Sequence, residues 1–156
     1  AYSTRVGAGP FPSELPNELG EKIRQIGAEF GATTGRPRRT GWMDLVATKF
    51  AARLNGTTAI NLTKLDVLND LPEIQICTKY LLDGEEIFSP PAAIEDYEKV
   101  EPVFETFPGW ESDISAARKI SELPANAQKY IQFIKKFLGI PVRWVGVGVE
   151  RAAMAV

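Results

Sequence analysis

The chain has 156 residues, of which 44% are hydrophobic and 24% charged, and its formal net charge is −2. This composition is typical of a soluble folded domain with its own core, and it excludes a disordered segment and a strongly basic nucleic-acid-binding protein. No apolar run approaches the roughly 20 residues that cross a bilayer, so we expect no membrane span and no secretory signal.

Two residue types restrict the chemistry that the chain can perform. There is no histidine, so no side chain that ordinarily titrates near neutral pH serves acid–base chemistry. The single cysteine, Cys77, lies in an alternating strand-like run and is expected to be a buried, inert thiol. One cysteine cannot form an internal disulfide, which favours the cytoplasm. The chain opens at Ala1 without a methionine, and we therefore expect it to be a portion of a longer protein.

The first predicted elements are two loops and two helices. A loop rich in glycine and proline covers Thr4–Pro12. Asn17 is a candidate N-cap for a first helix whose apolar positions continue to Ile26. A second loop, Gly31–Gly41, leads into a helix over Met43–Leu54, which the following Asn-Gly pair stops.

The later predicted elements are mostly strands. They are the strand Thr58–Thr63, the hairpin strands Glu73–Leu81 and Glu86–Phe88, the strand Val100–Phe107, a helix opened by Ser121 and Pro124 and stopped by Gly139, and the strand Val142–Val145. The Asp-Gly pair between the hairpin strands is the signal of a tight β-turn. A helix followed by a strand with a polar loop at its carboxyl end is how ligand sites arise in open α/β sheets.

The segment Thr63-Lys64-Leu65-Asp66 matches a pattern that recognises guanine. Guanine presents N1–H and its 2-amino group side by side, so one carboxylate accepts both hydrogen bonds, whereas adenine offers neither donor. The lysine can lay its methylene stem along the face of the base. The alternative is a strand end with a solvated lysine and a helix-capping aspartate, and these four residues alone leave it open.

The loop Gly31–Gly41 combines glycines with Arg36, Arg38 and Arg39. Glycines let a backbone approach a ligand, and arginine forks suit carboxylate or phosphate, so the loop is predicted to bind an anion. The structural alternative is a surface loop whose arginines pair with neighbouring acids. A nucleic-acid patch is disfavoured by the net charge of −2 and by the lack of interleaved aromatic residues.

Five segments resemble the adenylosuccinate synthetase family and occur in the order of that family. They are Thr4–Pro12, Gly31–Arg39, Gly41–Asp44, Thr63–Leu68 and Phe107–Trp110. Five motifs in register are not an accident. The resemblance spans positions 4 to 148, which is nearly the whole chain, and the residues after Gly148 resemble the family only loosely.

The resemblance implies a fold, an activity and partners. The fold is the carboxy-terminal portion of a P-loop-NTPase-like α/β fold: part of a mostly parallel sheet with flanking helices and an antiparallel hairpin, forming one domain or fragment over residues 1–156. The family condenses inosine monophosphate (IMP) with L-aspartate, using GTP and Mg²⁺, to give adenylosuccinate, GDP and phosphate in AMP biosynthesis. It transfers the γ-phosphoryl group of GTP to the purine 6-oxygen before the aspartate amine displaces phosphate. The resemblance also implies a cytoplasmic homodimer.

The resemblance further implies the residues that hold each ligand. The aspartate-binding loop comprises Ala32, Thr33, Thr34, Gly35, Arg36, Pro37 and Arg38. Within it, Arg36 also reaches the ribose of IMP and Arg38 the GTP side, while Val6 contacts IMP. The GTP-binding residues besides Arg38 are Lys64, Leu65 and Asp66 and the closing segment Gly146, Val147 and Gly148. That closing segment, taken alone, also fits a strand end or a tight turn.

The catalytic residues of the family and its phosphate-binding loop lie in its amino-terminal portion. The resemblance therefore implies no catalytic residue and no metal ligand in this chain, with the Mg²⁺ ligands elsewhere, and we expect the chain alone to be inactive. The alternative function is a stand-alone guanine-nucleotide-binding module without catalysis. A third hypothesis is a nucleic-acid-binding domain built on Arg36–Arg39.

Overall fold

A computed structural model describes all residues from Ala1 to Val156, and the chain divides into two compact units. The first unit contains Ala1, Ala51–Ile74 and Thr106–Val156, and the second contains Tyr2–Phe50 and Gln75–Glu105. The predicted guanine motif therefore belongs to the first unit, and the predicted anion loop belongs to the second.

The chain forms nine strands, four α-helices and two short 3₁₀ helices. The helices are α1 (Glu18–Ile26), α2 (Leu45–Leu54), η1 (Asp66–Leu68), α3 (Ile94–Tyr97), η2 (Ile120–Glu122) and α4 (Ala125–Leu138). The strands are β1 (Ser3–Arg5), β2 (Arg39–Gly41), β3 (Met43–Asp44), β4 (Ile60–Leu62), β5 (Glu73–Leu82), β6 (Glu85–Ile87), β7 (Glu101–Pro108), β8 (Val142–Gly146) and β9 (Met154–Ala155). No helix is long and apolar enough to cross a membrane.

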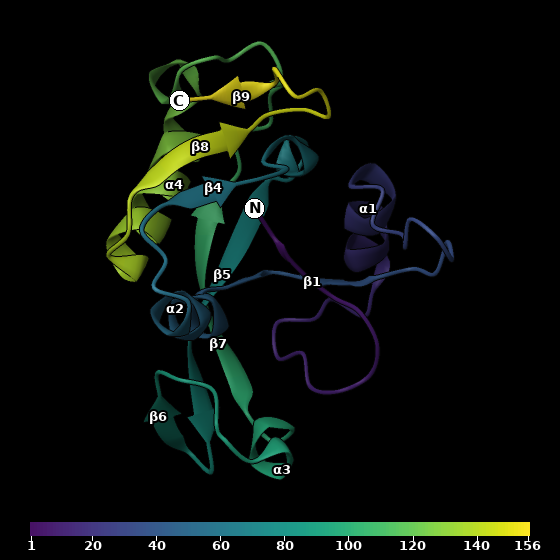
Figure 1. Cartoon of the computed structure of the whole chain (residues 1–156), viewed down its shortest axis with the longest axis vertical. Helices are drawn as coiled ribbons and strands as arrows, with labels where there is room; N and C mark the ends of the chain where they lie inside the picture. Colours follow the sequence, from purple (N-terminus) through teal and green to yellow (C-terminus); the bar gives the residue numbers. More distant parts are fainter. The chain divides into compact units, whose positions relative to one another are not determined.

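The first unit is built on a three-stranded sheet. Strands β4 and β8 are parallel, with Leu62 opposite Val145, and β9 pairs antiparallel with β8. Figure 1 shows these three strands side by side. Because β4 and β8 run in the same direction, the loops that follow them leave from the same edge of the sheet, which is where ligands bind in open α/β sheets.

Helix α4 supplies much of the core of this unit. One face of the helix is buried, as the helical spacing of its apolar residues predicts; its buried residues are Ala127, Tyr130, Ile131, Ile134 and Leu138. The helix ends at Gly139, whose φ of 71° is the left-handed conformation of a C-cap. The prediction that Ser121 opens this helix is wrong, because Ser121 lies in η2 and α4 begins at Ala125.

A four-stranded sheet, in which β3, β6 and β7 all pair with β5, lies mostly in the second unit, although residues 73–74 of β5 and 106–108 of β7 belong to the first. Strands β3 and β5 are parallel, whereas β5 and β6 form an antiparallel hairpin. Its turn residues Asp83 and Gly84 have φ values of 52° and 85°, and two positive φ values are what a two-residue turn of this hand requires. The predicted hairpin is therefore confirmed, and with it the predicted α/β class with an antiparallel hairpin.

Strands β1 and β2 correct the prediction of two loops. They pair antiparallel, with Ser3 opposite Gly41 and Arg5 opposite Arg39, so each predicted loop contains a short strand. The local sequence could not indicate this pairing, because the two strands are far apart in the chain and rich in glycine neighbours. Gly41 is required by packing, since a Cβ at this position would lie 2.3 Å from the Ser13 carbonyl oxygen.

The start of α2 also differs from the prediction. Met43 and Asp44 form β3, and the helix begins at Leu45. Asp44 is 4% exposed; its Oδ1 accepts a hydrogen bond from the Ala47 N–H at 3.0 Å, and its Oδ2 accepts one from the Tyr80 hydroxyl at 2.5 Å. Burial raises the pKa of Asp44. This carboxylate therefore caps the helix and joins it to β5.

The predicted cap of α1 is confirmed, because the Asn17 side chain accepts a hydrogen bond from the Gly20 N–H of the helix.

Candidate functional site

The predicted guanine motif follows the carboxyl end of β4. Lys64, half-buried, has a φ of 58°, a left-handed conformation that is uncommon outside glycine and is found disproportionately at functional sites. This turn of the backbone brings the chain from the end of β4 into η1, where Asp66 is the first residue. The strand is shorter than predicted, since it spans Ile60–Leu62 rather than Thr58–Thr63.

Asp66 carries the most informative side chain in this segment. Its Oδ1 is buried and accepts no hydrogen bond. Leu65 occupies the N-cap of η1, and no side chain caps this helix, so the reading of Asp66 as a helix-capping residue is wrong. Burial raises the pKa of the Asp66 carboxyl group. Since buried acceptors in native proteins are normally paired, an unpaired carboxylate oxygen here suits donors supplied by a ligand.

The glycine-containing segment after β8 lies against this motif. The Leu65 N–H donates to the Gly146 carbonyl at 2.9 Å, and a Cβ at Gly146 would lie 3.2 Å from the Lys64 nitrogen. Val147 is fully buried, and its N–H donates to the Ala153 carbonyl at 3.0 Å. The structure thus brings the two predicted GTP-binding segments together, and Val147 turns its side chain into the core.

A tryptophan supports the segment that carries Asp66. The Trp110 Nε1–H donates to Asn69 Oδ1 at 3.0 Å, and the Gly109 N–H donates to the Pro72 carbonyl at 2.7 Å. A Cβ at Gly109 would lie only 1.6 Å from the Leu71 carbonyl oxygen. The family-like Pro-Gly-Trp segment therefore packs directly on the chain that follows η1. Asn69 is a contact that the sequence did not reveal, because nothing in its neighbourhood distinguishes it from a surface asparagine.

The predicted aspartate-binding loop is the tip of a hairpin in the second unit. Gly31 and Arg36 are joined by a backbone hydrogen bond of 2.8 Å, and the Gly35 N–H donates to the Gly31 carbonyl at 2.8 Å. Below them, Phe30 and Pro37 form an isolated antiparallel bridge. The residues of the tip, from Ala32 to Pro37, are exposed. The loop is therefore a compact turn that presents its hydroxyl groups and Arg36 to solvent.

The three arginines of the loop are not equivalent. Arg36 is exposed and forms no ion pair. Arg38 Nη1 lies 2.9 Å from Glu29 Oε2. Arg39 makes a two-pronged ion pair with Glu14, with Nε–Oε1 and Nη2–Oε2 distances of 2.8 and 2.5 Å. The structural alternative raised for the loop, pairing with neighbouring acids, therefore holds for Arg39 and partly for Arg38.

Arg39 also binds the chain that follows β1. Its Nη1 donates to the Gly9 carbonyl at 2.7 Å, and its guanidinium carbon lies 5.6 Å from the centre of the Phe11 ring. Nearly all of its donors are used within the protein, so Arg39 fixes the loop that leads from β1 to α1. With Arg38 and Arg39 both neutralised by carboxylates, the segment offers little of the free positive charge that nucleic acid requires.

The Glu14–Arg39 pair predicts a pH-dependent contribution to stability. The hydrogen bond from Arg39 holds the pKa of Glu14 below its ordinary value. A carboxyl group whose folded pKa is lowered stabilises the protein above its unfolded pKa, and this contribution is lost as pH falls through the folded value. We expect Glu14→Gln to lower the melting temperature at neutral pH but not at a pH below both values. Melting curves across pH check this; an equal difference at all pH values would contradict it.

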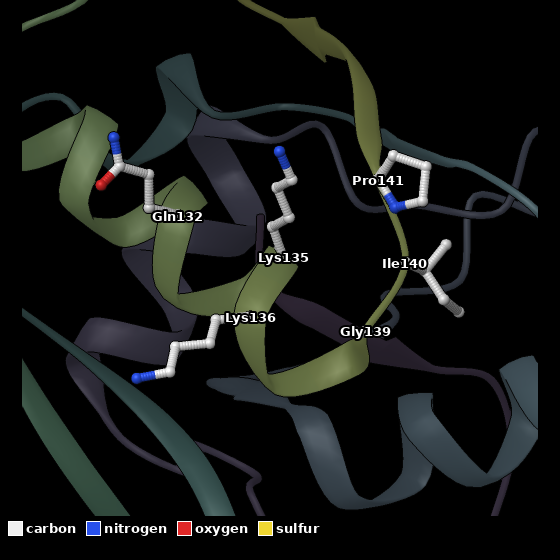
Figure 2. A pocket seen from close by; sticks show the side chains of 6 residues that line it. All are labelled: Gln132, Lys135, Lys136, Gly139, Ile140 and Pro141. Carbon is white, nitrogen blue, oxygen red and sulfur yellow. The ribbon is translucent and has the colours of Figure 1, made fainter.

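The hollow at the end of α4 and the buried cysteine offer no second candidate site. A hollow of about 520 Å³ lies at the end of α4, but Figure 2 shows its two lysines, Lys135 and Lys136, pointing in different directions, so the hollow does not gather charge. Cys77 is fully buried, as predicted, and burial raises the pKa of its thiol to about 12. No group of three or more His, Cys, Asp or Glu side chains in the chain could hold a metal ion.

The fold is that of an α/β protein in which the predicted guanine-binding segments follow the carboxyl ends of two parallel strands, β4 and β8, while the predicted anion loop is a hairpin of the second unit. The chain belongs to the adenylosuccinate synthetase family, whose model matches residues 1–155. It is 56% identical over 154 residues to adenylosuccinate synthetase from Coccidioides posadasii and 55% identical over 157 residues to the chloroplastic enzyme from Chlamydomonas reinhardtii.

These similarities cover nearly the whole chain but only part of each relative. The two alignments span 99% and 100% of this chain and 37% and 34% of the relatives. A solved structure of fully ligated adenylosuccinate synthetase from Plasmodium falciparum matches with a TM-score of 0.96 and 46% identity, over 99% of this chain and 38% of that one. The chain therefore spans little more than a third of the length of the relatives that it matches.

Proposed function

We propose that this chain is the carboxy-terminal portion of an adenylosuccinate synthetase, a GTP-dependent carbon–nitrogen ligase of purine biosynthesis. The whole enzyme condenses IMP with L-aspartate and releases GDP and phosphate, with adenylosuccinate as the product. The observation that carries the proposal is the buried, unpartnered Oδ1 of Asp66 beside Lys64, because a carboxylate in that state suits the two adjacent donors of guanine. The match of residues 1–155 to the adenylosuccinate synthetase family supports this proposal.

In this proposal the first unit selects the nucleotide. Asp66 accepts from N1–H and the 2-amino group, while the Lys64 stem covers one face of the base. Gly146 and Gly148 let the backbone close over the ring, since a glycine leaves room for close approach. The main chain of Leu65, bonded to the Gly146 carbonyl at 2.9 Å, holds the two segments in this arrangement.

The second unit, in this proposal, gathers aspartate. Thr33, Thr34 and the backbone of the hairpin tip bind its carboxylates together with Arg36, whose guanidinium is exposed and unpaired. Arg36 also reaches the ribose of IMP. Arg38 binds aspartate and GTP through the guanidinium N–H donors that are not paired with Glu29.

The chemistry itself is proposed to reside elsewhere in the enzyme. The γ-phosphoryl group passes to the purine 6-oxygen and the aspartate amine then displaces phosphate, steps that need a base and a metal. This chain contains no histidine, and in this proposal no catalytic step is assigned to its own side chains. A cytoplasmic homodimer remains the expectation, although one relative is chloroplastic.

A stand-alone guanine-nucleotide-binding module is the second candidate. It is favoured by one observation: Lys64, Asp66 and the Gly146–Gly148 segment all belong to the first unit, so base recognition does not need the arginine loop. Without contacts to the phosphates, we expect such binding to be weak.

The experiment that separates these functions compares two proteins. We expect the full-length product of the gene to form adenylosuccinate from IMP, GTP and aspartate, and the 156-residue chain alone to form none. The release of phosphate and the appearance of adenylosuccinate are followed together. Turnover by the chain alone would overturn the assignment of the catalytic groups to the rest of the enzyme, and a full-length product that binds GTP without turnover would favour the module.

A further inference from the structure

Glu29 is a buried carboxylate at the base of the arginine loop. Its side chain is almost inaccessible, with the residue 3% exposed. It precedes the hairpin of Gly31–Arg36 by only two residues, yet neither the loop motif nor the spacing of the helix singles it out. A buried carboxylate in a surface hairpin requires compensation, so the groups around it must account for its presence.

The contacts of Glu29 converge on Arg38. Its Oε2 accepts from Arg38 Nη1 at 2.9 Å, and its main-chain carbonyl accepts from the Arg38 N–H at 2.9 Å. The other carboxylate oxygen, Oε1, accepts from the Tyr2 hydroxyl at 2.6 Å. The Arg38 carbonyl in turn accepts from Arg24 Nε at 2.7 Å. Both the backbone and the guanidinium of Arg38 are therefore held in place.

This arrangement leaves Arg38 anchored but able to bind. Its side chain is 36% exposed, and a guanidinium has five N–H donors, of which the Glu29 carboxylate takes one at Nη1. Arg36 has no such anchor. An anchored side chain loses less conformational freedom on binding than a free one.

We propose that Glu29 is a positioning residue that sets the orientation of Arg38 for aspartate. The inference rests on the proposed function, in which Arg38 binds this substrate. Glu29 itself touches no ligand. It acts by holding one edge of the Arg38 guanidinium, so that the remaining N–H donors face a fixed direction. Its negative charge also compensates the positive charge of Arg38, which would otherwise repel Arg36 two residues earlier.

The test is Glu29→Gln in the full-length enzyme. Glutamine keeps the volume and an acceptor for the Tyr2 hydroxyl but removes the charge that holds Arg38. We expect the KM for aspartate to rise about tenfold while kcat stays within about twofold, because the change removes substrate binding rather than a contact made only in the transition state. The KM for GTP should change less, because Lys64, Asp66 and the Gly146–Gly148 segment bind GTP in addition to Arg38 in the proposed function.

The control is Tyr2→Phe, which removes the hydrogen bond from the Tyr2 hydroxyl to Glu29 Oε1 and leaves the ion pair between Glu29 and Arg38 in place. We expect its KM for aspartate to stay near the wild-type value, even if its melting temperature falls. A rise equal to that of Glu29→Gln would mean that loss of structure, not of positioning, is responsible, and would overturn the inference.

A double-mutant cycle with Arg38→Met separates the inference from the proposed function. If Glu29 acts through Arg38, Glu29→Gln has almost no further effect on the KM for aspartate once Arg38 is methionine. Equal effects in both backgrounds would overturn the positioning role alone. An Arg38→Met enzyme with an unchanged KM for aspartate would instead remove the substrate role of Arg38, and the positioning role with it.

Discussion

Asp66→Asn is expected to lower kcat/KM for GTP by about a hundredfold or more in the full-length enzyme. The substitution turns one carboxylate oxygen into an amide donor that faces the N1–H or 2-amino donor of guanine. Two hydrogen bonds to a charged acceptor are lost or weakened, each worth about 1.5–3 kcal/mol, and the mispaired donors remain buried. Steady-state kinetics with varied GTP at saturating IMP and aspartate measures the loss.

Xanthosine triphosphate makes this expectation specific to the base. Xanthine carries a carbonyl at position 2, so an asparagine amide can donate where the aspartate would repel. The variant should use xanthosine triphosphate better than the wild type does, a change in preference that general damage to the fold cannot produce. The matched control is Asp70→Asn, which alters an exposed aspartate four residues along the chain and should leave GTP use unchanged. If xanthosine triphosphate gains nothing relative to GTP, Asp66 does not read the base.

The sequence predicted the local elements well where one residue type carries the signal. Asp83-Gly84 predicts a two-residue turn because few other residues adopt two positive φ values in succession. Asn17 predicts a helix start because its side chain can accept a hydrogen bond from a free backbone N–H. Gly139 predicts a helix end because glycine readily adopts the left-handed conformation of a C-cap. These interactions close within a few residues, so a single sequence contains all that determines them.

The elements that the sequence missed depend on contacts between distant segments. Met43 and Asp44 follow the helical spacing of α2, yet they pair with β5, more than thirty residues later. Strands β1 and β2 likewise stabilise each other across the first helix. Propensity is a weak guide here, because long-range backbone pairing decides the conformation of such short segments.

The same distinction applies to the candidate site. Lys64 and Asp66 are only two residues apart, so their pattern is visible in the sequence and predicts a guanine-binding segment directly. The roles of the arginines were not predictable, because Glu14 and Glu29 are ordinary acids until the fold brings them against Arg39 and Arg38. Three arginines of similar sequence context thus divide into one exposed, one anchored and one structural side chain. The ligand assignments of the loop remain predictions that rest on the family.

Gly109→Ala is expected to destabilise the protein by at least about 3 kcal/mol, near the upper end for a single added methyl group. A Cβ at this position would lie 1.6 Å from the Leu71 carbonyl oxygen and 2.8 Å from its carbonyl carbon. Because these atoms are backbone, no side chain can rotate to relieve the clash. The Gly109 N–H also donates to the Pro72 carbonyl at 2.7 Å, so separating the two segments breaks that bond. Denaturant unfolding measures the change.

The substitution at Gly109 should also weaken the binding of GTP. The Leu71 N–H donates to the Leu68 carbonyl at the end of η1, so moving Leu71 shifts the short helix that begins at Asp66. We therefore expect Gly109→Ala to raise the KM for GTP more than the KM for aspartate. Gly56→Ala is the matched control: its φ is 58° but no atom lies within 4 Å of the added Cβ, so it should cost only about 1–2 kcal/mol from backbone strain. Equal losses at the two glycines would show that the contact with Leu71 costs no more than the backbone strain at Gly56, which would contradict the expected clash.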